Sequence, residues 1–142
     1  MILVEQPEAE DAAALLSGPQ GALLGNMLAA FGIAPEAVRI AALLPSHLPH
    51  PDWPALDRAG WGALARHHLR LAAPQRLLVL GEVALPLLGH DPAQPAADFN
   101  QVALEGGGGV AALCAPDLDT LLHRPRAKAR LWRRWLEWTD GN

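Results

Sequence analysis

The chain has 142 residues, of which 51% are hydrophobic and 18% are charged, and this composition excludes a wholly disordered protein. The length suits one hydrophobic core and is too short for two, so we expect a single domain over residues 1–142. No apolar run approaches the roughly 18 residues of a membrane helix, and residues 1–5 lack the basic start of a signal peptide. A soluble, cytoplasmic protein is therefore predicted.

The net charge of −4 hides two oppositely charged parts of the chain. Residues 1–123 contain thirteen acidic side chains and five arginines, whereas residues 124–142 contain six Lys or Arg and two acidic side chains. Non-specific affinity for DNA comes from neutralising phosphates, so the acidic part is a poor DNA binder. Any contact with DNA, or with an acidic partner protein, is therefore expected in the C-terminal segment.

The first half of the chain alternates apolar runs with loops and a helix. Residues 2–5 read as a buried strand, and residues 6–19, which are acidic and then rich in Gly and Pro, read as a loop. Apolar residues at helical spacing predict a helix over 20–31. Residues 38–44 predict a strand buried on both faces, and the prolines of 45–54 predict an irregular loop.

The second half begins with a long amphipathic pattern that predicts one helix over residues 53–73. The apolar run 76–81 predicts a strand, and a short helix is expected over 82–88. Residues 102–110 resemble a hairpin, followed by a strand over 110–115.

A final helix is expected to open at Pro125, since proline is favoured in the first turn of a helix. Alternation of strands with helices predicts a three-layer α/β/α fold with right-handed crossovers. We expect its central sheet to be mostly parallel and to have four strands, at residues 2–5, 38–44, 76–81 and 110–115.

Neither the glycine run nor the histidines predict a cofactor or a metal. The run Gly106–Gly109 lies between two strand-like pieces without the Lys and the helix of a phosphate-binding loop, and it predicts a hairpin tip. His47, His50 and Asp52 fall short of the three or four ligands of a zinc site. Cys114 lies in an apolar stretch and is expected to be a buried, inert thiol.

Tryptophan recurs every three residues in the last helix, at Trp132, Trp135 and Trp138. In one interpretation the tryptophans dock the helix on the sheet and the basic residues face solvent. In the other they form a partner interface, because Trp and Arg are enriched at such surfaces, and DNA contact would also use it. The candidate binding residues are Arg124, Arg126, Lys128, Arg130, Trp132, Arg133, Arg134 and Trp135.

Short segments along nearly the whole chain resemble the short iron–sulfur uracil-DNA glycosylases and their relatives. Their opening Gly-Glu-x-Pro-Gly loop corresponds to residues 4–8, which keep the Glu and the Pro. Their Pro-Phe-x-Gly-x-x-Gly-x-Leu-Leu segment corresponds to residues 15–24, where both glycines and both leucines stand. Their Leu-Gly-x-x-Ala signature corresponds to residues 80–84, and Lys-x-x-x-Trp to residues 128–132. The resemblance implies a uracil-DNA glycosylase-like fold.

The residues that carry the chemistry of that family differ here. Leu16 stands where the family has the Phe on which uracil stacks, Ala42 where an Asn reads the uracil edge, and Asp117 where the catalytic His lies. Glu5 is retained, and Cys114 matches none of the four cluster cysteines, so no cluster is expected. Losing even one electrostatic donor typically costs about 10² to 10³ in rate, so several losses should abolish base release.

These differences lead us to expect a non-catalytic glycosylase-fold accessory protein that binds partner proteins in DNA replication or repair. Residues 28–45, 104–106 and 127–132 are similar to segments of the psi subunit of the bacterial DNA polymerase III clamp loader, which implies clamp-loader subunits as partners. One alternative is a divergent glycosylase that uses Glu5 or Asp117 to orient water. Another is a non-specific DNA-binding remnant that uses the basic C-terminal helix.

Overall fold

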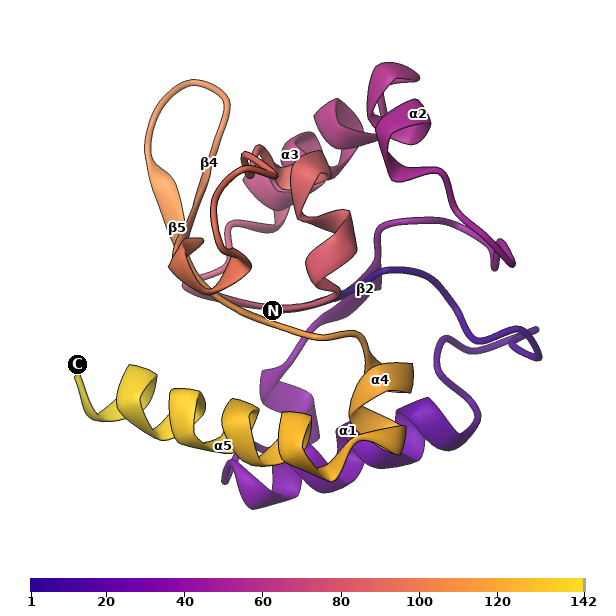
Figure 1. The fold of residues 1–142 in the computed structure, drawn as a ribbon, viewed down its shortest axis with the longest axis vertical. Coiled ribbons are helices and arrows are strands. Elements are labelled where there is room, and N and C mark those ends of the chain that lie inside the picture. Colours follow the sequence, from indigo (N-terminus) through magenta and orange to yellow (C-terminus); the bar gives the residue numbers. More distant parts are fainter. Residues whose placement is uncertain (142) are drawn as a thin grey trace.

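The computed structural model describes residues 1–141, in which one sheet lies between two layers of helices (Figure 1). The strand order is β2-β1-β3-β5-β4. Neighbouring pairs among β1, β2, β3 and β5 run parallel, while β4 pairs antiparallel with β5. The strands are β1 (Ile2–Val4), β2 (Ile40–Ala42), β3 (Arg76–Leu80), β4 (Gln101–Ala103) and β5 (Gly109–Ala115).

The expectation of a four-stranded sheet is wrong, because the predicted hairpin contributes a strand of its own. Val102 pairs with Val110, so β4 extends the sheet beyond β5 as a fifth, antiparallel strand. The expected hairpin is confirmed, and its turn is made possible by Gly106, Gly107 and Gly108, which all have positive φ. A glycine-rich turn of this kind tolerates conformations that side chains resist.

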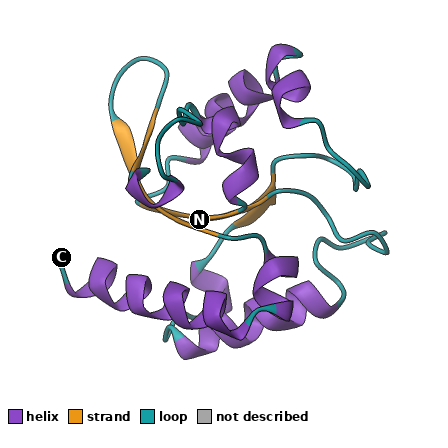
Figure 2. Cartoon of the chain, viewed as in Figure 1, coloured by secondary structure: helices purple, strands orange, loops and turns teal. Residues whose placement is uncertain are grey.

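The helices divide between the two faces of the sheet (Figures 1 and 2). One face is covered by α2 (Trp53–Arg58), α3 (Trp61–Ala72) and the 3₁₀ segment η2 (Glu82–Leu88). The other is covered by α1 (Pro19–Ala30), α4 (Leu118–His123) and α5 (Pro125–Asp140). Short 3₁₀ turns, η1 and η3, cover Pro35–Ala37 and Ala96–Asp98. The three-layer α/β/α arrangement agrees with the expectation from the sequence.

Two local expectations were wrong, and one helix was missed. The helix expected over 53–73 is two helices, because the chain turns at Gly60 with φ of 100° and restarts at Trp61. Helix α4 was not anticipated. Residues 38–44 are not a strand buried on both faces: only 40–42 pair, and β2 is an edge strand with a half-exposed side.

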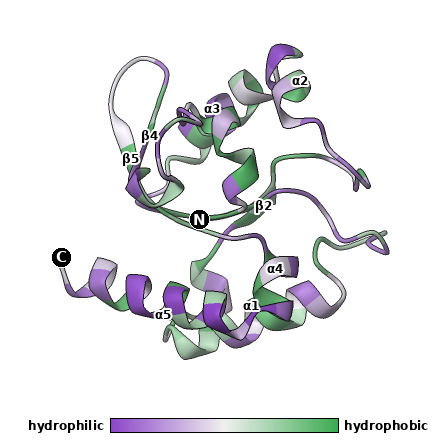
Figure 3. Cartoon of the chain, viewed as in Figure 1, coloured by the Kyte–Doolittle hydropathy of each residue, from purple (hydrophilic) through white to green (hydrophobic). Residues whose placement is uncertain are grey.

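Two hydrophobic clusters fill the space on either side of the sheet. One joins Leu3, Leu77 and Val79 to α2, α3 and η2, and the other joins Ile2 and Leu78 to α1, α4 and α5. The alternation of neighbouring strand residues between the clusters is the expected two-residue period of a sheet covered on both faces. In Figure 3 the strands are mostly green, whereas much of α5 is purple. None of the helices in residues 1–141 has the length and apolarity to cross a membrane.

Candidate functional site: an acidic cleft at the carboxyl edge of the sheet

A cleft of about 590 Å³ opens where the parallel strands end. Val4 and Leu80 are paired last residues of β1 and β3, and Leu80 also pairs with Ala115 at the end of β5. The loops that follow these strands line the cleft. In open α/β sheets this edge is the usual place for a ligand, because loops from several strands converge there.

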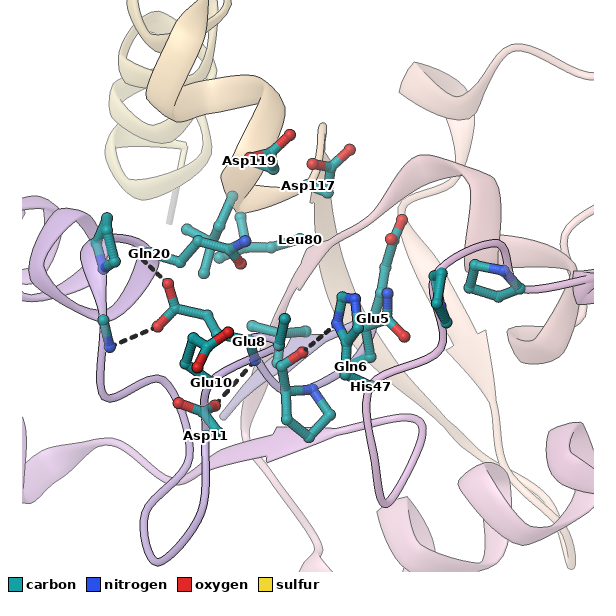
Figure 4. Close-up of a pocket in the computed structure, with 18 of the residues that line it drawn as sticks. Glu5, Gln6, Glu8, Glu10, Asp11, Gln20, His47, Leu80, Asp117 and Asp119 are labelled. Atoms are coloured by element: carbon teal, nitrogen blue, oxygen red, sulfur yellow. Dashed lines mark hydrogen bonds between the residues drawn. The ribbon is translucent and has the colours of Figure 1, made fainter.

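Six acidic residues contribute to the lining of this cleft, which we call the acidic cleft (Figure 4). His47 is the only side chain in the lining that can carry a positive charge. The result is a concave surface of strongly negative charge that repels phosphate and attracts cations. The lining carboxylates are Glu5, Glu8, Glu10, Asp11, Asp117 and Asp119.

Glu5 follows β1 and lies at the base of the acidic cleft. Its Oε1 is buried and has no hydrogen-bond partner in residues 1–141, and its side chain lies against Gly81, where a Cβ would overlap Cγ of Glu5. Burial first, and the negative charge of Asp117 second, raise the pKa of Glu5 to about 7. A carboxyl group with such a pKa can accept or donate a proton near neutrality.

Glu8 turns its carboxylate onto the start of α1. Its two oxygens accept hydrogen bonds from the backbone N–H groups of Gly18, at 2.7 Å, and Gln20, at 2.8 Å (Figure 4). Glu8 is only 8% exposed. Free amides at a helix N-terminus bind anions, and here the protein's own carboxylate takes that position. The start of α1 therefore offers no site for a phosphate or for a departing base anion.

Asp11 ties the preceding loop together. The Ser17 hydroxyl donates to it at 2.6 Å, and the N–H groups of Ser17, Leu16 and Glu8 donate as well. These hydrogen bonds, the Ser17 hydroxyl first, lower the pKa of Asp11 to about 2. The carboxylate therefore stays ionised at any physiological pH, and it fixes the loop that carries Glu8 into the cleft.

Asp117 begins α4 rather than pointing freely into the cleft. Its side chain accepts from the N–H of Thr120 at 2.8 Å and from the Thr120 hydroxyl at 2.9 Å, which makes it the N-cap of this helix. The negative charge of Asp117 contributes to the raised pKa of Glu5, after burial. The two carboxyl groups are thus electrostatically coupled.

Reciprocal hydrogen bonds hold the rim of the cleft. Gln6 Nε2 donates to the Leu48 carbonyl at 3.1 Å, and the Leu48 N–H donates to Gln6 Oε1 at 2.7 Å. The His47 ring bonds through Nδ1 with the Pro7 carbonyl at 3.0 Å. The loop after β1 and the proline-rich loop after β2 are therefore joined across the cleft.

The structure brings together two of the four residues that correspond to family site positions. Glu5 and Asp117 both line the acidic cleft. Leu16 and Ala42 do not: Leu16 is buried in the cluster beneath α1, with φ of 56°, and Ala42 lies on the edge strand. Neither residue is part of the cleft lining.

The candidate binding residues of α5 divide between two environments. Trp135 stacks on Phe31 with ring centroids 4.2 Å apart, and Arg134 donates to the Cys114 carbonyl, so both serve packing. Trp132 remains 40% exposed and contacts Phe31 at 5.7 Å between centroids. The remaining basic residues are exposed: Arg124, Arg126, Lys128, Arg130 and Arg133.

Cys114 and Asp52, two residues considered for chemistry in the sequence, have structural roles. Cys114 is fully buried, and burial raises the pKa of its thiol to about 12, which confirms a buried, unreactive side chain. Asp52 accepts from the Ala55 N–H and caps α2. Within residues 1–141, His, Cys, Asp and Glu form no group arranged to hold a metal ion.

Sequence reasoning missed Glu8, Glu10, Asp11 and Asp119 as members of the cleft. Their signal in the sequence is weak, because an acidic loop ordinarily indicates a solvated surface. Gly18 was identified only as a glycine of the family motif, and nothing in the sequence indicated that Glu8 would accept a hydrogen bond from its N–H.

A scan against protein-family models finds no family that matches this chain. A search of curated proteins likewise gives no significant match.

Proposed function

We propose that this chain is a non-catalytic, glycosylase-fold accessory protein that binds a partner protein of DNA replication or repair. A psi-like role beside a clamp loader is the most specific form of the proposal. The observation that carries it is the charge of the acidic cleft, where six carboxylates occupy the place of a substrate site. The proposed glycosylase fold is supported by the motif resemblance to the glycosylases, which covers residues 4–24, 80–84 and 128–132.

Base release makes demands that this cleft does not meet. A glycosylase must grip the DNA backbone and stabilise the anion of the departing base with preorganised donors. Here Glu8 occupies the amides at the start of α1, and the carboxylates of Asp117 and Asp119 repel an anion in the cleft. Each effect opposes the reaction independently, so their combination supports a protein without glycosylase activity.

The exposed face of α5 is the surface that we assign to the partner. Trp132 and Leu136, one helical turn apart, are each 40% exposed. Exposed Arg133 lies between them in sequence, and Lys128 precedes Trp132 by one turn. An exposed tryptophan flanked by basic residues is typical of the anchor of a protein interface. Capture of a replication or repair protein from cell extract by the wild type, with loss in Trp132→Ala, would support this assignment.

A second candidate function is a divergent damaged-base glycosylase, favoured by the properties of Glu5. A partly buried carboxyl with a pKa near 7 and an unpartnered oxygen has the character of a general base. In this candidate, Glu5 or Asp117 would orient the attacking water.

A base-release assay separates the two functions. The purified protein is incubated with single- and double-stranded oligonucleotides that contain uracil or other damaged bases, and strand breaks at abasic sites are counted after alkali. We expect no release above buffer from the wild type or from Glu5→Gln. Release that is lost in Glu5→Gln but kept in the matched variant Glu10→Gln would overturn the non-catalytic proposal.

A further inference from the structure

A cavity of about 300 Å³ opens at the amino edge of the parallel strands, at the opposite end of the sheet from the acidic cleft. We call it the tryptophan pocket. Its walls come from five segments: the starts of β1 and β3, the ends of α1 and α5, and the chain between α1 and β2. Sites for small molecules have volumes of roughly 300 to 1,000 Å³, so this pocket suits a ligand of one or two rings.

Three aromatic rings line the tryptophan pocket. Trp135 stacks on Phe31 with centroids 4.2 Å apart and meets Trp138 edge to face at 5.6 Å. Leu28 and Leu78 are buried and complete an apolar wall. Aromatic rings favour other rings in offset-stacked or edge-to-face contact. The lining therefore favours an aromatic ligand.

Arg76 is the only side chain in this lining that carries a charge. Its guanidinium lies 5.2 Å from the centroid of the Trp138 ring. Within residues 1–141, this guanidinium forms no ion pair and no hydrogen bond. A guanidinium presents a planar fork of N–H donors that matches the two oxygens of a carboxylate. The pocket thus combines an apolar aromatic wall with one unpaired positive group.

The acidic residues next to this lining in the sequence do not enter it. Glu36, Glu137 and Asp140 each adjoin a lining residue, but all three are exposed and none lines the pocket. A second cleft, of about 410 Å³, shares Arg76 with the pocket and adds Arg39, and no carboxylate lines it. The charge around the mouth of the pocket therefore favours an anionic group beside Arg76.

We propose that the tryptophan pocket binds a small aromatic carboxylate. The ring of the ligand contacts Trp135 and Trp138, and its carboxylate accepts hydrogen bonds from the Arg76 guanidinium. A neutral ring would leave that guanidinium without a partner, and an amine would be repelled by it. Trp132 does not line the pocket, so the inference does not rest on the proposed function of the exposed α5 face.

Four probes test the chemical class of the ligand. Naphthoate has the ring and the carboxylate, naphthamide has the same ring without the charge, naphthylmethylamine has the opposite charge, and octanoate has the carboxylate without a ring. Binding of each to the full chain is measured by isothermal titration calorimetry. We expect naphthoate to bind about tenfold more tightly than naphthamide, because a charge-assisted pair is replaced by a neutral one. It should bind about fivefold more tightly than octanoate, and the amine should bind most weakly.

Indole N–H signals in NMR spectra show where the probe binds. Trp53 lines the acidic cleft, and Trp61 lines a cavity of about 180 Å³ beside α3, so these two residues report binding at other sites. Naphthoate should shift the signals of Trp135 and Trp138 and leave those of Trp53 and Trp61 in place.

Two variants separate the contribution of the charge from that of the rings. Arg76→Gln changes an exposed side chain and should remove the tenfold preference for naphthoate over naphthamide, without changing the affinity for naphthamide. Trp138→Leu keeps the wall apolar and should lower the affinity for naphthoate about fivefold while leaving that for octanoate unchanged. Arg130→Gln is the matched control, since Arg130 is exposed on α5 and does not line the pocket; it should bind as the wild type does.

The following results would overturn the inference. Equal affinities for naphthoate and naphthamide, or a preference that survives in Arg76→Gln, would remove the role of Arg76. Octanoate that binds as tightly as naphthoate would exclude an aromatic specificity. Shifts of Trp53 or Trp61 in place of Trp135 and Trp138 would locate the ligand in another cleft.

Discussion

Gly21 and Gly81 lie where no larger residue fits. A Cβ on Gly21 would overlap the carbonyl oxygen of Leu16, and one on Gly81 would overlap the side chain of Glu5. Gly81 also has φ of 153°, which side chains rarely adopt. Both glycines correspond to family motif positions, and their physical role is close approach of backbone near the acidic cleft. This part of the site could be anticipated from the sequence, because a glycine requirement is visible as a residue type.

The pKa of Glu5 predicts how stability depends on pH. Glu5 holds its proton up to about pH 7 when folded, whereas its ordinary pKa is 4.5, so the folded state binds the extra proton between these values. The stability that this proton contributes is present below pH 4.5 and is lost as the pH rises through 7. Glu5→Gln keeps the shape without the charge and should raise the free energy of unfolding by about 2 kcal/mol near pH 8, and change it little near pH 4.

Urea unfolding at the two pH values measures this effect. Glu10→Gln, which removes a carboxylate from the exposed rim of the same cleft, is the control and should not change the pH dependence. An equal change for Glu5→Gln at both pH values would contradict the account of a buried, protonated Glu5.

In helix α5, residues that share the same spacing in the sequence differ in their surroundings. The three-residue spacing of its tryptophans predicted docking or partner binding, and in the structure the tryptophans differ in burial: Trp135 stacks on Phe31, whereas Trp132 is 40% exposed. Trp135 and Trp138 make an edge-to-face contact at 5.6 Å, and the guanidinium of Arg76 lies 5.2 Å from the Trp138 ring. Trp132 lies farther round the helix, and it is the tryptophan of α5 with the most exposed surface.

This division predicts unequal costs of truncation. Trp135→Ala removes the ring stacked on Phe31 and should lower the free energy of unfolding by about 3 kcal/mol. Trp132→Ala should lower it by less than about 1 kcal/mol, because much of its ring is already in water. Urea unfolding of both variants measures the difference. Equal losses would mean that Trp132 is a core residue and not available to a partner.

The regular elements could be predicted because buried strands and amphipathic helices impose a period on the sequence. Strand β3 and helix α5 lie close to their expected ranges. The break at Gly60 was missed because the apolar pattern continues through it into α3. The loops that form the cleft have no period. Their shape follows from hydrogen bonds between side chains and backbone groups that are far apart in the sequence, such as those between Gln6 and Leu48. Such pairs cannot be predicted from a periodic pattern of residue types.

For the whole molecule, the important property is how charge is distributed. Six of the thirteen acidic residues in 1–123 line the cleft at the carboxyl edge of the sheet, while exposed basic residues lie on α5. A DNA-processing enzyme needs positive potential around its substrate cleft. Here acidic side chains line the cleft, and the exposed basic residues lie on a helix that the cleft lining does not include.

Site-specific photo-crosslinking tests whether the exposed face of α5 binds a partner protein of DNA replication or repair. A photoreactive amino acid replaces Trp132 in one variant and Glu105, at the tip of the β4–β5 hairpin, in another, and crosslinked proteins are identified from living cells. We expect position 132 to capture a replication or repair protein and position 105 to capture none. Capture of no such protein from position 132, or of the same proteins from both positions, would contradict it.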